Sequence, residues 1–375
     1  MSSKAMARSV AGTAHDQGPM LSPQGRRPSA ARDDLLRQAS IARSLGSGFV
    51  AEVLAAAWRQ LDYAPRLAQT VDTWPGDPAA AAMAMRLNAG LHALARRGTI
   101  AGLSALYAGA PAIRDAHRLD GAIAAGLSRG EDVVLEWMSH PTQTNEVARS
   151  AAFMAALMTL AAQSDMPFDL LEIGASAGLN LLLDRYAHEL GGTAAGTPGS
   201  PVRIAPVWRG PPPPPAGVTI ASARGVDLRP LDIAEPFTRE RLLSYVWADD
   251  RPRAERLCQA ITLARACPPV IDRESAAPWL RRRLAEAQPA GICRVIQHSM
   301  VLQYLPEAER RGVLAAIIQA GAQATAERPL AWIALEWNAR RSEVQLRLTR
   351  WAGAGGESRV LATCHAYGAW IDWRG

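Results

Sequence analysis

The sequence predicts an α/β protein in which an N-terminal all-α domain precedes a seven-stranded, mostly parallel sheet. Two observations support this fold class. Residues 33–162 carry apolar side chains at helical spacing with no alternating strand pattern. After Pro167 the pattern changes to short apolar runs that alternate with amphipathic helices, as in parallel sheets. A chain of 375 residues can bury a full α/β core and a second domain.

The helices of the first domain begin at recognisable residues. Asp33 can cap the first helix, and the second runs from Ser47. Asp77 followed by Pro78 provides a cap and an N1 proline for the third, which ends near Gly98. Two further helices are predicted over residues 119–127 and 145–162.

The second domain, residues 167–375, alternates strands with helices. We predict strands over residues 168–173, 218–228, 270–272, 293–300, 330–337, 344–351 and 360–367. The intervening helices are predicted over residues 179–190, 235–265, 276–287 and 306–322. A glycine-rich link at residues 352–356 suits an antiparallel hairpin between the last two strands, and residues 191–217 form a proline-rich insertion that we expect to be a stiff surface loop.

Composition argues against several classes of protein. The net charge of +6 is small for this length and the arginines are scattered among acids, so we expect no nucleic-acid partner. The four cysteines show no metal-ligand spacing, which favours reduced thiols in a cytoplasmic protein and no metal site. The longest apolar stretch, residues 151–162, is too short to span a membrane. Residues 1–32 lack the apolar core of a signal peptide and are expected to form a disordered tail.

A glycine turn after the first strand is the most informative feature. The strand ends with Glu172, and Gly174, Ser176 and Gly178 follow before the pattern turns helical. A strand, a glycine turn and a helix in this order place free backbone N–H groups where nucleotide-like cofactors bind in open sheets. The alternative is a tight turn that binds no ligand.

Two aspartates follow the next strands. Asp227 is placed to accept hydrogen bonds from ribose hydroxyls, and Asp272 to accept one from an exocyclic adenine amine. Each is also explained as a helix cap or turn residue. Together with Glu172 they place acids at three successive strand ends, on the edge where ligands bind in open sheets, which favours a nucleoside pocket.

These segments resemble known families. Residues 170–180 resemble the first motif of class I (Rossmann-like) S-adenosylmethionine-dependent methyltransferases, acid-x-Gly-x-Gly-x-Gly, with Ser176 in place of the middle glycine. Residues 294–306 resemble the fourth strand of that superfamily and its following turn. More narrowly, residues 33–375 resemble a bacterial family of uncharacterised proteins with this methyltransferase-like core. Its recurring pieces are residues 143–149, 172–180, 225–230, 245–249, 298–304 and Glu336.

The resemblance implies a Rossmann-like seven-strand sheet with an all-α cap domain, and S-adenosylmethionine as the cofactor of an enzyme that acts on a small molecule. The cofactor-binding residues would be Glu172, Gly174, Ser176, Gly178, Asn180, Asp227 and Asp272. The sequence departs from the pattern at Ser176, where a glycine usually lets the backbone approach the cofactor. The spacing from Glu172 to Asp227 is also longer than the superfamily norm.

Candidate residues for the reaction lie at the tips of later strands and in the helical domain. His298 and Glu336 are the candidate catalytic residues, because an acceptor that loses a proton needs a base. His298 is equally explained as a core histidine, and Glu336 as the partner of an arginine. The candidate substrate-binding residues are Asn145, Glu146, Arg149 and Tyr304. The first three also fit a capping and salt-bridge cluster.

Two other functions use the same residues. The sequence Gly-Ala-Ser-Ala-Gly at 174–178 fits the nucleophile elbow of α/β-hydrolases, with Ser176, Asp272 and either His298 or His365 as a triad. Neither an oxyanion loop nor strands precede it, which argues against this reading. The other alternative is a non-catalytic scaffold that binds a ligand or a partner without turnover. The methyl acceptor and the oligomeric state remain open.

Overall fold

The computed structural model describes residues 29–109, 115–353 and 355–375. It divides into two compact units, residues 1–142 and 143–375, each described here by itself. The observed division precedes the boundary predicted near residue 162, because α8 (Ser150–Ala161) packs into the core of the sheet. Residues 1–28 of the predicted tail lie outside the described residues.

The first unit is helical, as predicted. Its described elements are α1 (Ala30–Ser44), α2 (Gly48–Gln60), η1 (Leu61–Tyr63), α3 (Pro65–Asp72), α4 (Met83–Arg97), α5 (Ala101–Ala108), α6 (Ala116–Arg129) and α7 (Glu131–Ser139). Ser47 caps α2 by accepting from the Val50 N–H. Ser29 caps α1 in place of Asp33, whose carboxylate instead accepts from the Trp58 indole. The helix predicted at Asp77 starts later, at Met83.

The second unit is built on a nine-stranded sheet. The seven predicted strands are present as β1 (Phe168–Ile173), β6 (Ile220–Asp227), β7 (Ile271–Arg273), β8 (Cys293–Ser299), β9 (Leu330–Trp337), β10 (Val344–Trp351) and β11 (Gly356–Cys364). Two strands extend the sheet beyond the prediction, β12 (Trp370–Trp373) and β5 (Val207–Arg209). The sheet is therefore larger than the seven strands expected.

The strand order places a reversal at the centre of the sheet. It runs β5-β12-β11-β10-β9-β8-β1-β6-β7. From β7 to β9 all neighbours are parallel, whereas β9 to β12 are joined by antiparallel pairs. After β1 the chain builds outward through β6 and β7, then returns to the other side of β1 with β8. Ligands of open α/β sheets bind at the carboxyl ends of strands at such a reversal.

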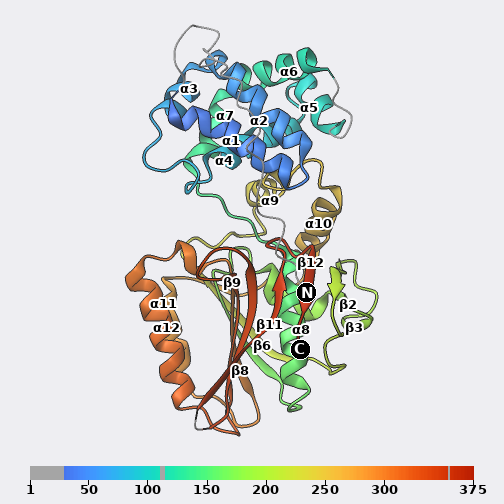
Figure 1. Ribbon diagram of the computed structural model, residues 1–375, viewed down its shortest axis with the longest axis vertical. Coiled ribbons are helices and arrows are strands. Elements are labelled where there is room, and N and C mark those ends of the chain that lie inside the picture. The colour runs from blue at the N-terminus through green and yellow to red at the C-terminus, as the bar shows by residue number, and fades with distance from the viewer. Residues whose placement is uncertain (1–28, 110–114, 354) are drawn as a thin grey trace, which may run out of the picture. The chain divides into compact units, whose positions relative to one another are not determined.

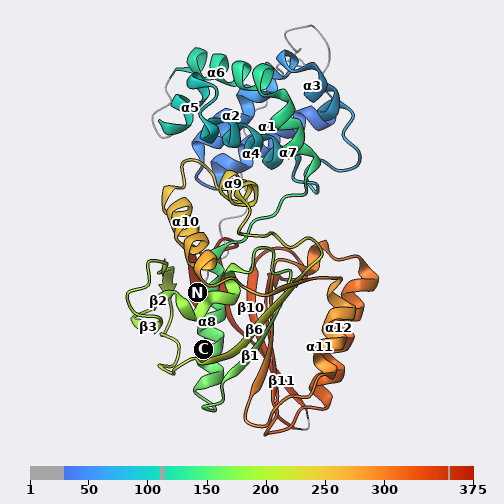
Figure 2. The same ribbon diagram turned by 180° about the vertical axis from the view of Figure 1, so that it is seen from behind.

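Helices cover both faces of this sheet (Figures 1 and 2). On one face α11 (Ala276–Ala285) and α12 (Glu307–Ala322) pack on Leu171, Ile173 and neighbouring strands. On the other, α8 and α10 (Arg251–Ala266) share a core with Phe168 and Leu170. Successive side chains of β1 therefore alternate between the two cores, as the twofold period of a strand requires.

Two predicted helices differ from the observed elements. The helix expected over residues 179–190 is a short 3-10 helix, η4 (Leu179–Arg185), followed by β2 (Ala187–Leu190). Leu182 leaves helical geometry (φ −98°, ψ 18°), and β2 joins a small sheet with β3 (Thr193–Gly196) and β4 (Arg203–Ile204). The helix expected over residues 235–265 is divided into α9 (Pro236–Ser244) and α10, whose start is capped by Asp250. Within the described residues, no helix is both long and apolar enough to cross a membrane.

Candidate functional site at the strand reversal

The carboxyl ends of β1 and β8 are adjacent where the strand order reverses. Glu172 pairs in register with Gln297, and Ile173 with His298. Glu172 and Gln297 lie on the α8 face, as Leu170 and Val295 do. His298 lies on the opposite face with Ile296. Glu172, a predicted cofactor-binding residue, and His298, a predicted catalytic residue, thus lie on opposite faces of the sheet.

Glu172 is a buried carboxyl, and its Oε2 has no hydrogen-bond partner among the described residues. Burial is the main reason that its pKa is raised to about 8. The amide of Gln297 favours the ionised form, yet the two side chains do not reach hydrogen-bond geometry. Asp227 raises the pKa further and Arg149 opposes this. The carboxyl is therefore mostly protonated at pH 7.

Other polar atoms in this neighbourhood are buried without partners. In the part of the chain that the structure describes, these are Gln297 Oε1 and Nε2, Asn180 Oδ1 and Ser176 Oγ. Buried polar groups are nearly always hydrogen-bonded, and an unpaired one costs about 1–3 kcal/mol. The strand ends therefore gather donors and acceptors that a ligand can satisfy.

The glycine turn is packed by protein where a side chain would project. Gly174 and Gly178 have φ of 69° and 71°. A Cβ on Gly174 would lie 2.5 Å from Val301 Cγ2, and one on Gly178 would lie 2.7 Å from Pro269. Backbone conformation and packing thus require both glycines, independently of any ligand.

The aspartate that ends β6 and the one within β7 both have protein partners. Asp227 accepts from the N–H groups of Ser176 (2.9 Å) and Arg229 (2.8 Å), so it holds the glycine turn against β6. Asp272 forms a two-bond ion pair with Arg224 and accepts from the Trp279 indole, and the Arg224 bond is the main reason that its pKa falls to about 2. Asp272 pairs with Val226 on the α11 face. The three predicted acids therefore do not share one face.

His298 is fully buried, and both of its ring nitrogens are engaged. Its Nδ1 lies 2.8 Å from Glu336 Oε1, and its Nε2 lies 2.8 Å from the Trp332 indole nitrogen. Glu336 Oε1 also accepts from the N–H groups of Val301 and Leu302. His298 thus has no free nitrogen to act as a base, which corrects our assignment. Glu336 Oε2 makes no hydrogen bond with the described residues.

The residues of the alternative hydrolase triad are not brought together. Ser176 Oγ has no partner in the described chain, and His298 is engaged with Trp332 and Glu336. His365 Nδ1 instead accepts from the Tyr367 N–H. Because Asp272 is paired with Arg224, no Ser–His–Asp chain of hydrogen bonds exists among these candidates.

The segment before α8 is fastened to the sheet unit at several points. Asn145 Oδ1 accepts from the Leu179 N–H at 2.9 Å, which occupies the start of η4. Glu146 is buried and pairs with Arg253 at 2.5 Å. Arg149, the last residue of η3 (Val147–Arg149), donates to Ala366 O and lies 3.4 Å from Ser299 Oγ. Asn145 and Glu146 are therefore structural, whereas Arg149 has no carboxylate partner in the described chain.

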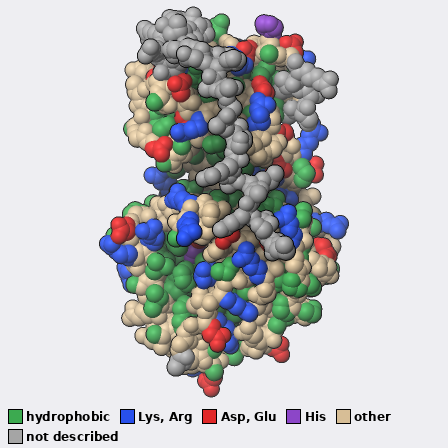
Figure 3. Space-filling view, viewed as in Figure 1, with side chains coloured by type: hydrophobic (Ala, Val, Ile, Leu, Met, Phe, Trp, Pro, Cys, Tyr) green, Lys and Arg blue, Asp and Glu red, His purple; other side chains and the backbone are tan. Residues whose placement is uncertain are grey.

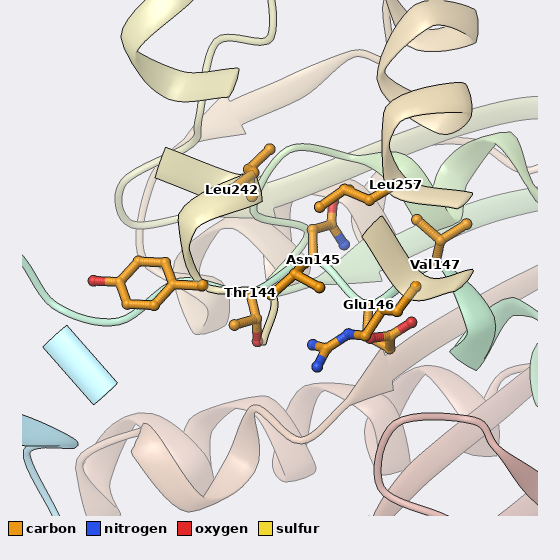
Figure 4. A pocket seen from close by; sticks show the side chains of 9 residues that line it. Thr144, Asn145, Glu146, Val147, Leu242 and Leu257 are labelled. Atoms are coloured by element: carbon orange, nitrogen blue, oxygen red, sulfur yellow. The ribbon is translucent and has the colours of Figure 1, made fainter. Parts of the chain in front are cut away.

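A cavity beside this segment is too small for a substrate. Thr144–Val147 line it together with α9, α10 and Tyr245 (Figure 4). Its volume of about 10 Å³ is near the minimum for one water molecule. The predicted contribution of Asn145 and Glu146 to substrate binding has no support from this cavity.

Unusual backbone conformations gather at the same edge of the sheet. The described residues other than glycine with positive φ are Ala82, Ser176, Met300 and Arg341. Three of them lie in the loops that follow β1, β8 and β9. Left-handed conformations of such residues are strained and concentrate at functional sites.

Sequence reasoning did not select Gln297, Ser299 or Tyr367 as site residues. Gln297 directly follows the apolar pair Val295 and Ile296 in β8, and this was the available indication of a buried polar role. Ser299 contacts Arg149, and Tyr367 influences the pKa of Arg149, only because the fold brings these distant segments together.

Neither the face shown in Figure 3 nor the described metal-ligating side chains indicate a further site. On the face shown in Figure 3, basic side chains are interspersed with acidic and apolar ones. Within the described ranges, no three His, Cys, Asp or Glu residues are grouped to hold a metal ion. These observations leave the strand reversal as the candidate site.

Comparison with known proteins identifies one family. A family model described as "Uncharacterized protein conserved in bacteria (DUF2332)" matches residues 32–373. No curated protein and no solved structure matches the chain.

Proposed function

This chain belongs to the DUF2332 family of uncharacterised bacterial proteins, and we propose that it is an S-adenosylmethionine-dependent, methyltransferase-like protein that acts on a small molecule. The cofactor would be held at the carboxyl ends of β1 and β8, on the α8 face. Glu172, Gln297 and Asn180 are the residues assigned to hold it.

The unpartnered polar atoms of this cluster are the observation that carries the proposal. Glu172 Oε2, Gln297 Oε1 and Asn180 Oδ1 are three buried acceptors, and an ammonium group has three N–H donors. Gln297 Nε2 is a donor suited to a carboxylate. The amino-acid end of S-adenosylmethionine carries both groups. A cation at this position would also lower the pKa of Glu172 and offset the cost of burying its charge.

The strand order supports the same location. β1 and β8 flank the reversal, where open α/β sheets bind ligands. In the proposal Asp227 fixes the turn through Ser176 and keeps lone pairs for ribose hydroxyls. We withdraw Asp272 from the cofactor site because its carboxylate is paired with Arg224 on the other face.

When bound, the cofactor supplies an electrophilic methyl group. Glu336 lies at the same carboxyl edge of the sheet, on the face of His298. It is assigned to take the proton that an acceptor loses, because Oε2 is its uncommitted oxygen within the described chain. His298 is a positioning residue for Glu336, since its Nδ1 is bound to the other oxygen.

A non-catalytic scaffold is the second candidate function. Packing around the glycine turn favours the scaffold, because Val301 and Pro269 occupy the space beside Gly174 and Gly178. The Leu179 N–H, which a cofactor could have used, is taken by Asn145. A scaffold would bind a ligand at Glu172 without turnover.

Calorimetric titration of the full chain with S-adenosylhomocysteine tests the proposal. We expect binding that Glu172→Gln and Gln297→Leu weaken at least tenfold, while the control Asp272→Asn changes it less than twofold. Neither heat nor a thermal shift at millimolar ligand would overturn the cofactor assignment. Binding without methyl transfer to any tested acceptor would favour the scaffold.

A further inference from the structure

Arg149 is a partly buried guanidinium without an ion-pair partner. Its Nε donates to Ala366 O at 2.9 Å, and its Nη1 lies 3.4 Å from Ser299 Oγ. Among the described residues, no carboxylate oxygen lies within the 4.0 Å of a salt bridge to Arg149. Burial lowers its pKa, and Glu146 and Tyr367 oppose this from a distance. A buried charge is normally paired, so this one has capacity for an anion.

The loop that follows β8 binds the carboxylate of Glu336, which lies at a distance from Arg149. Ser299 contacts Arg149, while the Val301 and Leu302 N–H groups bind Glu336 Oε1 at 2.9 and 3.3 Å. Glu336 acts electrostatically on Arg149 without pairing with it. The loop therefore holds opposite charges apart, an arrangement that a ligand with an anion and a hydrogen-bond donor can bridge.

An exposed aromatic side chain lies beside these charges. Tyr304, at the end of η5 (Leu302–Tyr304), is 73% exposed. Tyr304 lies two residues after Leu302, whose N–H binds Glu336, and its exposed ring offers a planar surface for stacking.

We propose that Arg149, Glu336 and Tyr304 form an acceptor subsite for a small aromatic carboxylate that bears a hydroxyl or amino group. Arg149 binds the carboxylate, Tyr304 stacks on the ring, and Glu336 Oε2 accepts the hydrogen bond of the hydroxyl or amino group. The claim that the ligand bound in this subsite accepts a methyl group rests on the proposed function. Glu336 would take the proton of that group, while the bound cofactor would supply its methyl group to the oxygen or nitrogen and keep the electron pair of the broken sulfur–methyl bond.

The experiment titrates the full chain with 4-hydroxybenzoate and salicylate, and with their amides, 4-hydroxybenzamide and salicylamide. At least one acid is expected to bind tenfold or more tightly than its amide. Arg149→Gln should abolish this preference, whereas Arg281→Gln, on α11, should retain it. Equal binding of acids and amides, or an unchanged preference in Arg149→Gln, overturns the subsite.

A second measurement uses wild-type protein in case the variant does not fold. Phenylglyoxal modification is followed by mass spectrometry at Arg149 and Arg281, and the acid should slow it at Arg149 alone. Equal protection, or none, overturns the subsite. The two proposals fail separately: S-adenosylhomocysteine binding without acid preference refutes the subsite only, and acid preference without cofactor binding refutes methyl transfer only.

Discussion

The indole of Trp332 donates to His298 Nε2 over 2.8 Å. Because an indole nitrogen can only donate, Nε2 must be an acceptor, and the imidazole proton is on Nδ1 facing Glu336. Three side chains on two neighbouring strands thus form one directed series of hydrogen bonds. Its end point is Oε1 of Glu336, so it orients this carboxylate and is not a route for a proton from substrate.

Removing the indole donor should release His298. We expect Trp332→Phe to lose about 1–3 kcal/mol of unfolding free energy, because Nε2 is left buried and unpaired. In wild-type protein, ¹⁵N spectra should show the Nδ1-protonated tautomer, and the variant should show a mixture. Trp351→Phe is the control, since that indole makes no hydrogen bond with described residues. The same tautomer in both variants would contradict the directed series.

The raised pKa of Glu172 predicts how stability depends on pH. Its pKa is about 8 in the folded protein against an ordinary value of 4.5. Between these values the folded state holds a proton that the unfolded state has lost, so the unfolding free energy falls as pH rises. The slope from this group is at most about 1.4 kcal/mol per pH unit.

Glu172→Gln removes the titrating group and keeps the shape. Relative to wild type, the variant should gain stability from pH 5 to pH 8 in urea unfolding, and the difference should level off above pH 8. A difference that is constant over this range would mean that the carboxyl titrates normally.

The glycine turn predicts a steric outcome. Gly174→Ala should destabilise the fold by roughly 2 kcal/mol or more, through left-handed strain and contact with Val301. Gly199→Ala has similar φ but open space, and should cost only the strain. Adding Val301→Ala should recover part of the loss in the first variant, as measured by urea midpoints. If both glycine variants lose the same stability, packing at Val301 is not the cause.

Asp272 should behave as a structural ion pair. Asp272→Asn is expected to cost about 1 kcal/mol at pH 7, a modest value because Arg224 is 40% exposed. The pKa of Asp272 is lowered to about 2 from 3.8, so this stabilisation is present above pH 4 and is lost as pH falls toward 2. Guanidinium unfolding at pH 7 and pH 2.5 measures it. An undiminished difference at pH 2.5 would contradict the ion pair.

Ser176 should not act as a nucleophile. A fluorophosphonate probe is expected to leave the protein unlabelled, because no histidine is hydrogen-bonded to Ser176 Oγ in the described chain. Stoichiometric labelling that is lost in Ser176→Ala would restore the hydrolase alternative.

The strands were predictable from sequence because burial on both faces gives short apolar runs. β9 and β10 were predicted with the bounds observed. The helix after Gly178 was not predictable, because leucines at 179, 182 and 183 have helical spacing but serve a 3-10 turn. Its shape depends on Leu182 and on the bond from Leu179 to Asn145, which lies far away in sequence.

The sequence predicted that the candidate residues lie at strand ends, but not which face of the sheet each one occupies. Glu172, His298 and Glu336 all lie at strand ends, as expected. Which face each occupies depends on register, and a shift of one residue exchanges the faces. Partners such as Arg224 for Asp272 and Trp332 for His298 come from neighbouring strands, so no local pattern in the sequence could predict them.

The central position of β1 has a consequence for biosynthesis. Phe168 pairs with Ile220 in β6 and with Cys293 in β8, so one neighbour of β1 is translated long after it. Until residue 299 has left the ribosome, one edge of this apolar strand has no permanent partner. Nascent chains that stall before β8 would expose that edge, and we expect such fragments to aggregate or to recruit chaperones.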